Sequence, residues 1–89
     1  MEEKRTPGIP GLNDKERAEL FASRLEQVRK NSKQTNANFA ALAGISPNTV
    51  SMAIRRQRIP NGTTIALLCE AHGIRADWLL GLTEEKEEW

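Results

Sequence analysis

The stretch that most constrains the fold of this chain is residues 36–55, which read NANFAALAGISPNTVSMAIR. Gly44 stands near its middle, and Ser46 and Pro47 follow as a helix-capping residue and a residue suited to the first helical position. Small and apolar residues recur where two steeply crossed helices need to contact each other and a core: Phe39, Ala40, Ala43, Ile45, Val50 and Ala53. The pattern predicts two short helices joined by a tight turn at Gly44.

The composition requires a small, aliphatic core. The chain has 89 residues, of which 38% are hydrophobic and only 4% aromatic, and it contains no Tyr. This length suffices for one domain with a core of a few helices. A core of Leu, Ile, Val and Ala favours helices over sheet. We therefore expect an all-α fold, a compact bundle of five short helices that contains the two-helix motif.

Capping residues, apolar spacing and glycines indicate where each helix begins and ends. Asn13 and Glu16 form a capping box at the first helix, Asn61 caps the fourth, and Gly73 ends it. The five helices are expected over about 14–30, from residue 35 or 36 to just before Gly44, over 47–55, from Asn61 to Gly73, and over about 77–80. The folded domain is then 13–82, between a flexible N-terminal arm (1–12) and an acidic C-terminal tail (83–89).

The charges are segregated along the chain, although the net charge is only +1. Residues 24–58 hold seven cations and one anion, a net charge of +6, whereas residues 70–89 hold six anions and two cations, a net charge of −4. A positive region over the two-helix motif is what attraction to phosphates requires. The acidic end is expected to face away from such a partner.

Several classes of function find no support in the sequence. A single cysteine, Cys69, excludes an intrachain disulfide, and with the single His72 it cannot complete a four-ligand zinc site. Both residues are interpreted as packing residues on one helical face. We recognise no acid–base pair, no phosphate-binding glycine loop, no membrane span and no secretion leader. We therefore expect no enzyme activity, no metal, no cofactor and no small-molecule ligand, and a cytoplasmic location.

Three pieces of the chain, in order, resemble the lambda-repressor-like family, the Cro and phage-repressor type of helix-turn-helix DNA-binding domain. They are the junction at 39–46, Thr49-Val50-Ser51, and 71–74 leading to 77–80; the last is similar to the N-terminal domains of bacteriophage repressors. The resemblance covers about 20–82. It implies a sequence-specific transcriptional regulator, a phage or bacterial repressor on the nucleoid, which binds a palindromic operator in double-stranded DNA as a homodimer.

The resemblance also implies residue roles, with the helix over 47–55 in the major groove and the preceding helix across the backbone. An amide such as Asn48 can pair with adenine, and Met52 offers an apolar surface to a thymine methyl. The expected base contacts are Pro47, Asn48, Ser51 and Met52. The expected phosphate contacts are Asn36, Ser46, Thr49, Arg55, Arg56 and Arg58. The dimer surface is expected at Trp78, Leu79 and Leu82.

The chain departs from the family pattern at four positions. Asn36 stands where the family has glutamine, Arg56 where glycine is common, His72 in place of leucine, and Arg75 in place of a serine cap. Other interpretations stay open. The motif could be an ordinary helical hairpin, and the arginine cluster a solvated turn. The whole chain could also be a protein-interaction or antitoxin-like adaptor with the same fold.

Overall fold

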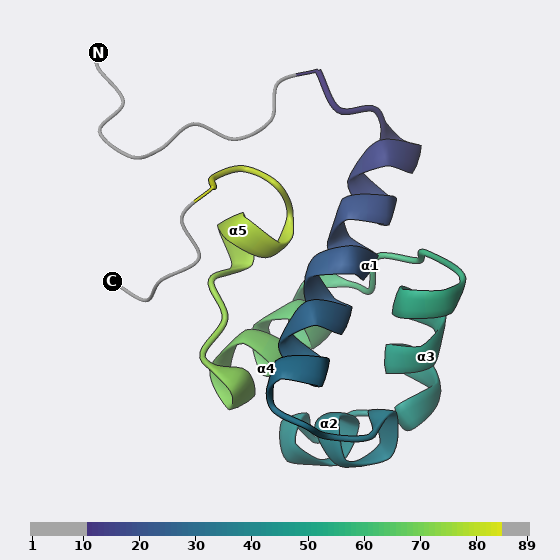
Figure 1. Cartoon of the computed structure of the whole chain (residues 1–89), viewed down its shortest axis with the longest axis vertical. Coiled ribbons are helices and arrows are strands. Elements are labelled where there is room, and N and C mark those ends of the chain that lie inside the picture. Colours follow the sequence, from purple (N-terminus) through teal and green to yellow (C-terminus); the bar gives the residue numbers. More distant parts are fainter. Residues whose placement is uncertain (1–10, 85–89) are drawn as a thin grey trace.

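A computed structural model of the chain describes residues 11–84, in which there are five helices and no strand (Figure 1). The helices are α1 (Asp14–Asn31), α2 (Asn36–Ala43), α3 (Pro47–Arg55), α4 (Gly62–His72) and α5 (Ala76–Leu79). The predicted all-α bundle is confirmed, and the predicted helix bounds hold to within one residue. The predictions for the arm over 1–10 and for the tail over 85–89 lie outside the described residues.

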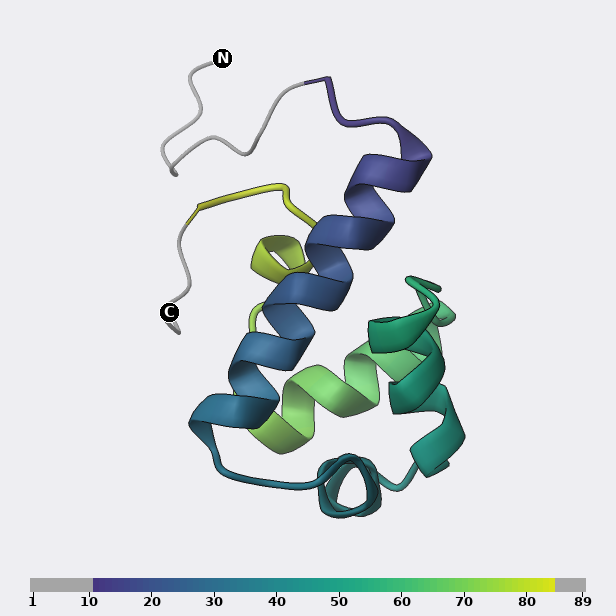
Figure 2. The same ribbon diagram turned by 45° about the vertical axis from the view of Figure 1, so that its right-hand side comes forward.

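The longest helix, α1, packs against α3 and α5. Figures 1 and 2 show α1 along the length of the molecule, with α3 on one side of it and α5 on the other. α2 packs against α3 and α4, and α3 also packs against α1. The two-helix motif is therefore held from behind by α1 and α4, and the outer side of α3 lies at the edge of the molecule.

Side-chain caps start the first four helices where the sequence indicates. The Asn13 side chain accepts the Glu16 N–H at 2.7 Å, and the Glu16 carboxylate accepts the Asn13 N–H at 3.1 Å, which completes the predicted capping box. Thr35, Ser46 and Asn61 cap α2, α3 and α4 in the same way. Only α5 lacks a side-chain cap, and there the Arg75 guanidinium pairs instead with Asp77, at 2.8 Å.

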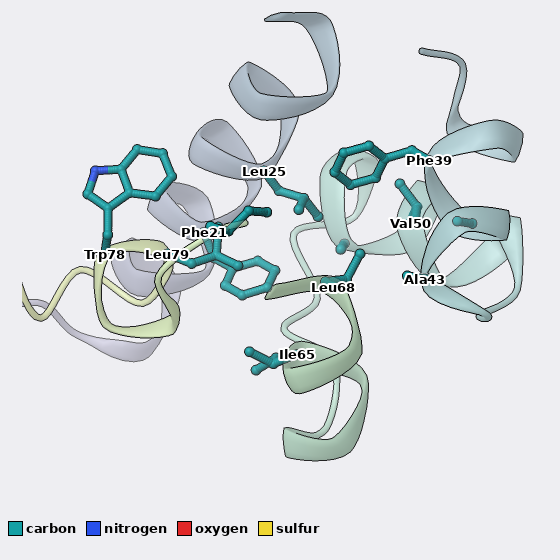
Figure 3. Close-up of a cluster of buried hydrophobic side chains, with 12 residues drawn as sticks. Phe21, Leu25, Phe39, Ala43, Val50, Ile65, Leu68, Trp78 and Leu79 are labelled. Atoms are coloured by element: carbon teal, nitrogen blue, oxygen red, sulfur yellow. The ribbon is translucent and has the colours of Figure 1, made fainter. Parts of the chain in front are cut away.

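The core is a single cluster of buried side chains from all five helices (Figure 3). Its largest fully buried side chains are Phe21 and Leu25 of α1, Phe39 of α2, Val50 of α3, Leu68 of α4 and Leu79 of α5. The residues predicted to form the inner side of the motif belong to this cluster, with Ile45 packed against it as a half-buried member. Burial of these apolar surfaces is the main favourable contribution to folding.

Trp78 and Leu79 belong to this core, contrary to the prediction that they form a dimer surface. Trp78 is 5% exposed and Leu79 is fully buried, because the short α5 turns both side chains toward the core. The guanidinium of Arg24 lies 4.8 Å from the centre of the Trp78 ring, on its face. Of the three predicted residues only Leu82, at 53% exposure, is at the surface.

The packing interpretation of His72 and Cys69 agrees with their surroundings. The His72 ring stacks on the Phe39 ring at 3.7 Å with an interplanar angle of 3°, and its Nε2 lies 2.9 Å from the Phe39 carbonyl oxygen. Cys69 is half-buried against the core. Over residues 11–84 no three His, Cys, Asp or Glu side chains gather as metal ligands, and no helix is long and apolar enough to cross a membrane.

Arg24 attaches the end of the described chain to α1. It is 8% exposed and donates hydrogen bonds to the carbonyl oxygens of Trp78 and Thr83 and to the Glu84 carboxylate. Arg17, seven residues earlier on the same helix, donates to the Leu80 carbonyl oxygen. Thr83 is fully buried, so the packed structure extends one residue beyond the predicted domain end at Leu82.

We predict that Arg24→Met lowers the free energy of unfolding by about 2–3 kcal/mol, because it leaves buried carbonyl oxygens without their charged donor. Urea denaturation followed by circular dichroism measures this. Lys30→Met is the matched control on the same helix, since Lys30 is exposed and only 3.6 Å from the exposed Glu26 carboxylate; it should change stability by less than about 0.5 kcal/mol. Equal effects of the two variants would contradict a structural role for Arg24.

The turn after α3 has a left-handed residue one position later than the family pattern suggests. Arg56, which stands where glycine is common, has a φ of −100° that any residue can adopt. Gln57 has a φ of 54° instead. This conformation is unfavourable for residues with a Cβ atom. Position 56 therefore does not require glycine. The Arg56 side chain that stands there is exposed.

We predict opposite effects of glycine at these two neighbouring positions. Gln57→Gly should raise the free energy of unfolding by up to about 1 kcal/mol, because it removes the left-handed penalty. Arg56→Gly should lower it by about 0.5–1 kcal/mol, because it only increases the entropy of the unfolded chain. Thermal and urea unfolding of both variants check this. A stabilising Arg56→Gly would show that residue 56, and not Gln57, adopts the left-handed conformation.

Candidate nucleic-acid interface

The inner side of α3 is buried, which leaves its other side as a surface of the molecule. Val50 and Ala53 are in the core. Helical spacing places Pro47, Asn48, Ser51 and Met52 together on the other side. Pro47 and Asn48 are exposed, whereas Ser51 and Met52 are half-buried. The four residues predicted to contact bases therefore share one face, which we call the outer face of α3.

The start of α3 is fixed by its cap. The Ser46 hydroxyl accepts the backbone N–H of Asn48 at 3.2 Å, and the Ser46 carbonyl oxygen accepts the Thr49 N–H at 3.0 Å. Ser46 is exposed and Thr49 is half-buried, so both predicted phosphate contacts lie at the N-terminal end of α3. Backbone N–H groups at such an end favour a nearby anion.

A polar contact joins α2 to the outer face of α3. The Asn36 side-chain amide, Nδ2, lies 3.2 Å from the Ser51 hydroxyl oxygen and donates to it. Asn36 is half-buried, and its carbonyl oxygen Oδ1 is buried without a hydrogen-bond partner. The structure therefore brings together two predicted site residues to which different roles were given, a phosphate contact for Asn36 and a base contact for Ser51.

A groove runs between the outer face of α3 and the loop that follows it. Asn48, Thr49 and Met52 line one side, and Arg58, Ile59 and Pro60 line the other. Ile59 and Pro60 are not among the residues that the sequence predicted for the site. They directly follow a basic residue, but only the return of the loop toward α4 places them beside Asn48 and Met52.

Three arginines at the C-terminal end of α3 and in the loop after it are available to a partner. Arg55, Arg56 and Arg58 are all exposed, and none of them forms a salt bridge with another residue of 11–84. At physiological pH each guanidinium is charged. This cluster extends the outer face of α3 with three positive charges.

Other cations of the positive region contribute less than the charge count suggests. Arg24 is buried under the C-terminal end. Arg29 donates to the Gln34 carbonyl oxygen at 2.8 Å, and Lys30 lies 3.6 Å from Glu26. The net charge of residues 24–58 therefore overstates the charge of the outer face.

Near the start of α1, a hydrogen bond to Glu19 raises the pKa of Lys15 above its ordinary value.

Comparisons with known proteins agree with this geometry. The chain is similar to the P22 c2 repressor crystallised with a synthetic operator, at 28% identity over 67% of this chain and 91% of that one, with a TM-score of 0.63. It is also similar to the restriction-modification controller protein C.AhdI from Aeromonas hydrophila, at 26% identity over 70% and 94%, with the same TM-score of 0.63. A hypothetical transcription factor, NHTF, from Neisseria shares the fold at 21% identity over 86% and 88%, with a TM-score of 0.67.

No curated protein sequence matches the chain significantly. The family model described as helix-turn-helix matches residues 25–79, which is more than half of the chain. This range contains α2, the Gly44 turn, α3, α4 and α5, together with the C-terminal part of α1. The predicted resemblance to phage repressors is thus confirmed, and the chain belongs to the helix-turn-helix family.

Proposed function

We propose that this chain, a DNA-binding transcriptional regulator, represses transcription by binding a palindromic operator as a homodimer, with α3 in the major groove. The observation that carries the proposal is the outer face of α3, where Asn48, Ser51 and Met52 lie beside a cluster of exposed arginines. Hydrogen-bonding and apolar groups on an exposed helix are what base edges require, and flanking cations are what phosphates require. The role is noncatalytic and takes place on the nucleoid, in the cytoplasm.

The residues of the outer face have different tasks in this proposal. Asn48 is exposed on the first turn of α3, where its amide oxygen can accept from adenine N6 while its NH₂ donates to adenine N7. Ser51 contributes a single hydroxyl. Met52, with Ile59 across the groove, offers an apolar surface to a thymine methyl. Pro47 has no N–H and contributes only shape.

Phosphate contacts hold the outer face of α3 in the DNA major groove but do not distinguish one base sequence from another. Ser46 and Thr49 lie at the N-terminal end of α3, and Arg55, Arg56 and Arg58 at its C-terminal end and in the following loop. The two groups are separated by the length of α3, so they can contact the phosphates on both sides of a major groove.

Dimerisation follows from the small number of bases that one α3 can read. A single helix in the groove contacts too few base pairs for useful specificity, whereas two copies on a two-fold-symmetric site read twice as many. Because Trp78 and Leu79 are buried, Leu82 is the predicted dimer-surface residue that remains exposed for an interface at the C-terminal end of the domain.

An adaptor role on the same fold is the second candidate. The observation that favours it is Leu42 of α2, which is 61% exposed on a helix of mostly small residues. A large exposed apolar side chain can form part of a protein-binding surface when neighbouring residues extend it into a contiguous patch. If the chain is only an adaptor, replacing Asn48 and Arg55 by alanine should leave its function intact.

We predict a steep salt dependence of DNA binding. With about four phosphates neutralised per subunit, the logarithm of the affinity of a dimer should fall against the logarithm of salt concentration with a slope of roughly −7. Fluorescence anisotropy with operator and random duplexes at several salt concentrations measures it. Affinity without either a salt slope or a sequence preference would rule out the repressor function.

We predict different signatures for a base contact and a phosphate contact. Asn48→Ala should weaken operator binding by about 1–3 kcal/mol and leave random-duplex binding nearly unchanged. Arg55→Ala should weaken binding to both duplexes and make the salt slope shallower by about 1. The same anisotropy titrations separate the two, and a uniform loss for Asn48→Ala would contradict its role as a base reader.

A further inference from the structure

The hydrogen bond between Asn36 and Ser51 has a direction. An amide nitrogen only donates, so the Ser51 oxygen is the acceptor when Asn36 Nδ2 faces it at 3.2 Å. A serine hydroxyl has one hydrogen and two lone pairs. With one lone pair engaged by Asn36, the hydroxyl hydrogen remains for another partner.

The surroundings of Asn36 favour this direction over its reverse. Asn36 Oδ1 is buried and has no hydrogen-bond partner. If the amide were turned around, the buried position would hold an NH₂ group with two unsatisfied donors in place of one carbonyl oxygen. Orphaned N–H groups are rarer in proteins than under-satisfied carbonyl oxygens, and each buried donor without a partner costs free energy. The contact therefore keeps its donor toward Ser51.

The position of Ser51 gives this direction a consequence for DNA. Ser51 lies on the outer face of α3, one turn after Pro47 and beside Met52, so its hydroxyl faces the same side as the proposed base contacts. In the major groove, guanine O6 and N7, adenine N7 and thymine O4 accept hydrogen bonds, whereas the cytosine amine only donates. A hydroxyl whose hydrogen is free matches the acceptors.

We infer that Asn36 is a positioning residue for sequence recognition, which makes Ser51 a hydrogen-bond donor to an acceptor on one base in each half-site. This inference rests on the proposed function. It replaces the predicted phosphate contact at Asn36, whose side chain is one methylene shorter than the family's glutamine and is already engaged by Ser51.

The experiment selects binding sites from a random duplex library with the wild-type chain and five variants. Ser51→Ala and Asn36→Ala should each lower the base preference at the same single position of the half-site by roughly 3- to 10-fold, the effect of one hydrogen bond. The double variant should lose no more than Ser51→Ala alone, because both changes remove the same interaction. Asn38→Ala is the matched control on α2, since the Asn38 side chain is exposed; it should leave every preference unchanged.

Asn36→Asp gives a sharper test because it reverses the hydrogen bond. A carboxylate only accepts, so the Ser51 hydrogen would turn toward it and the Ser51 lone pairs would face the base. The preference at that one position should shift toward bases that donate, cytosine through N4 or adenine through N6. Preferences normalised within each selection separate this shift from the general loss of affinity that an added negative charge near phosphates causes.

Two patterns of change in the variants would overturn the inference, and so would a wild type that enriches no sequence or an Asn36→Ala variant that retains the preference. In the first, Asn36→Ala weakens binding to all sites equally and makes the salt slope shallower, as loss of a phosphate contact does. In the second, Asn36→Ala and Ser51→Ala change preferences at different positions. Circular dichroism melting of each variant confirms that the chain is folded. If the wild-type chain enriches no sequence, the proposed function fails, and this inference with it. If the wild type enriches a site and Asn36→Ala retains its preference, only the inference fails.

Discussion

The burial of Val50 and Ala53 against the other helices is the constraint on which the rest of the structure depends. These two residues commit one side of α3 to the core that also contains Phe39 and Leu25. Because a helix has a fixed periodicity, this commitment also decides which residues point outward. The outer face is therefore set by the core and not by its own polar residues. The Gly44 turn, with a φ of 72°, allows α2 and α3 to meet at the angle that this packing needs.

Arginine has two distinct physical roles in this chain. Arg24 and Arg17 donate to backbone carbonyl oxygens of the C-terminal segment, and there the planar, multiply donating guanidinium holds the chain to α1. Arg55, Arg56 and Arg58 are exposed beside the outer face of α3. A charge count along the sequence cannot separate these roles, because it records the presence of a cation and not the direction of its side chain. The packing of α5 on α1 brings the C-terminal carbonyl oxygens to Arg24 and Arg17, and so gives these two arginines their structural role.

Much of the fold was predictable because its signals are local. Asn13 with Glu16, Ser46 with Pro47, and Asn61 act on backbone groups within three residues, so sequence neighbours suffice to locate helix starts. The interpretation of Trp78 and Leu79 as a dimer surface was wrong for the opposite reason. Whether a large apolar residue of a short helix is core or surface depends on the elements that pack over it, and here α1 and Arg24 cover that position.

The sequence by itself determined the helices, the Gly44 turn and the inner side of the motif, since each follows from caps, glycines or helical period over short separations. The four candidate base contacts came instead from the resemblance to the repressor family. The tertiary structure alone decided three further matters. It buried Trp78, Leu79 and Thr83, it brought Ile59 and Pro60 to the groove beside Met52, and it joined Asn36 to Ser51 across fifteen positions of the chain. These contacts depend on how helices cross. Crossing is set by the packing of the whole core, which local patterns do not specify.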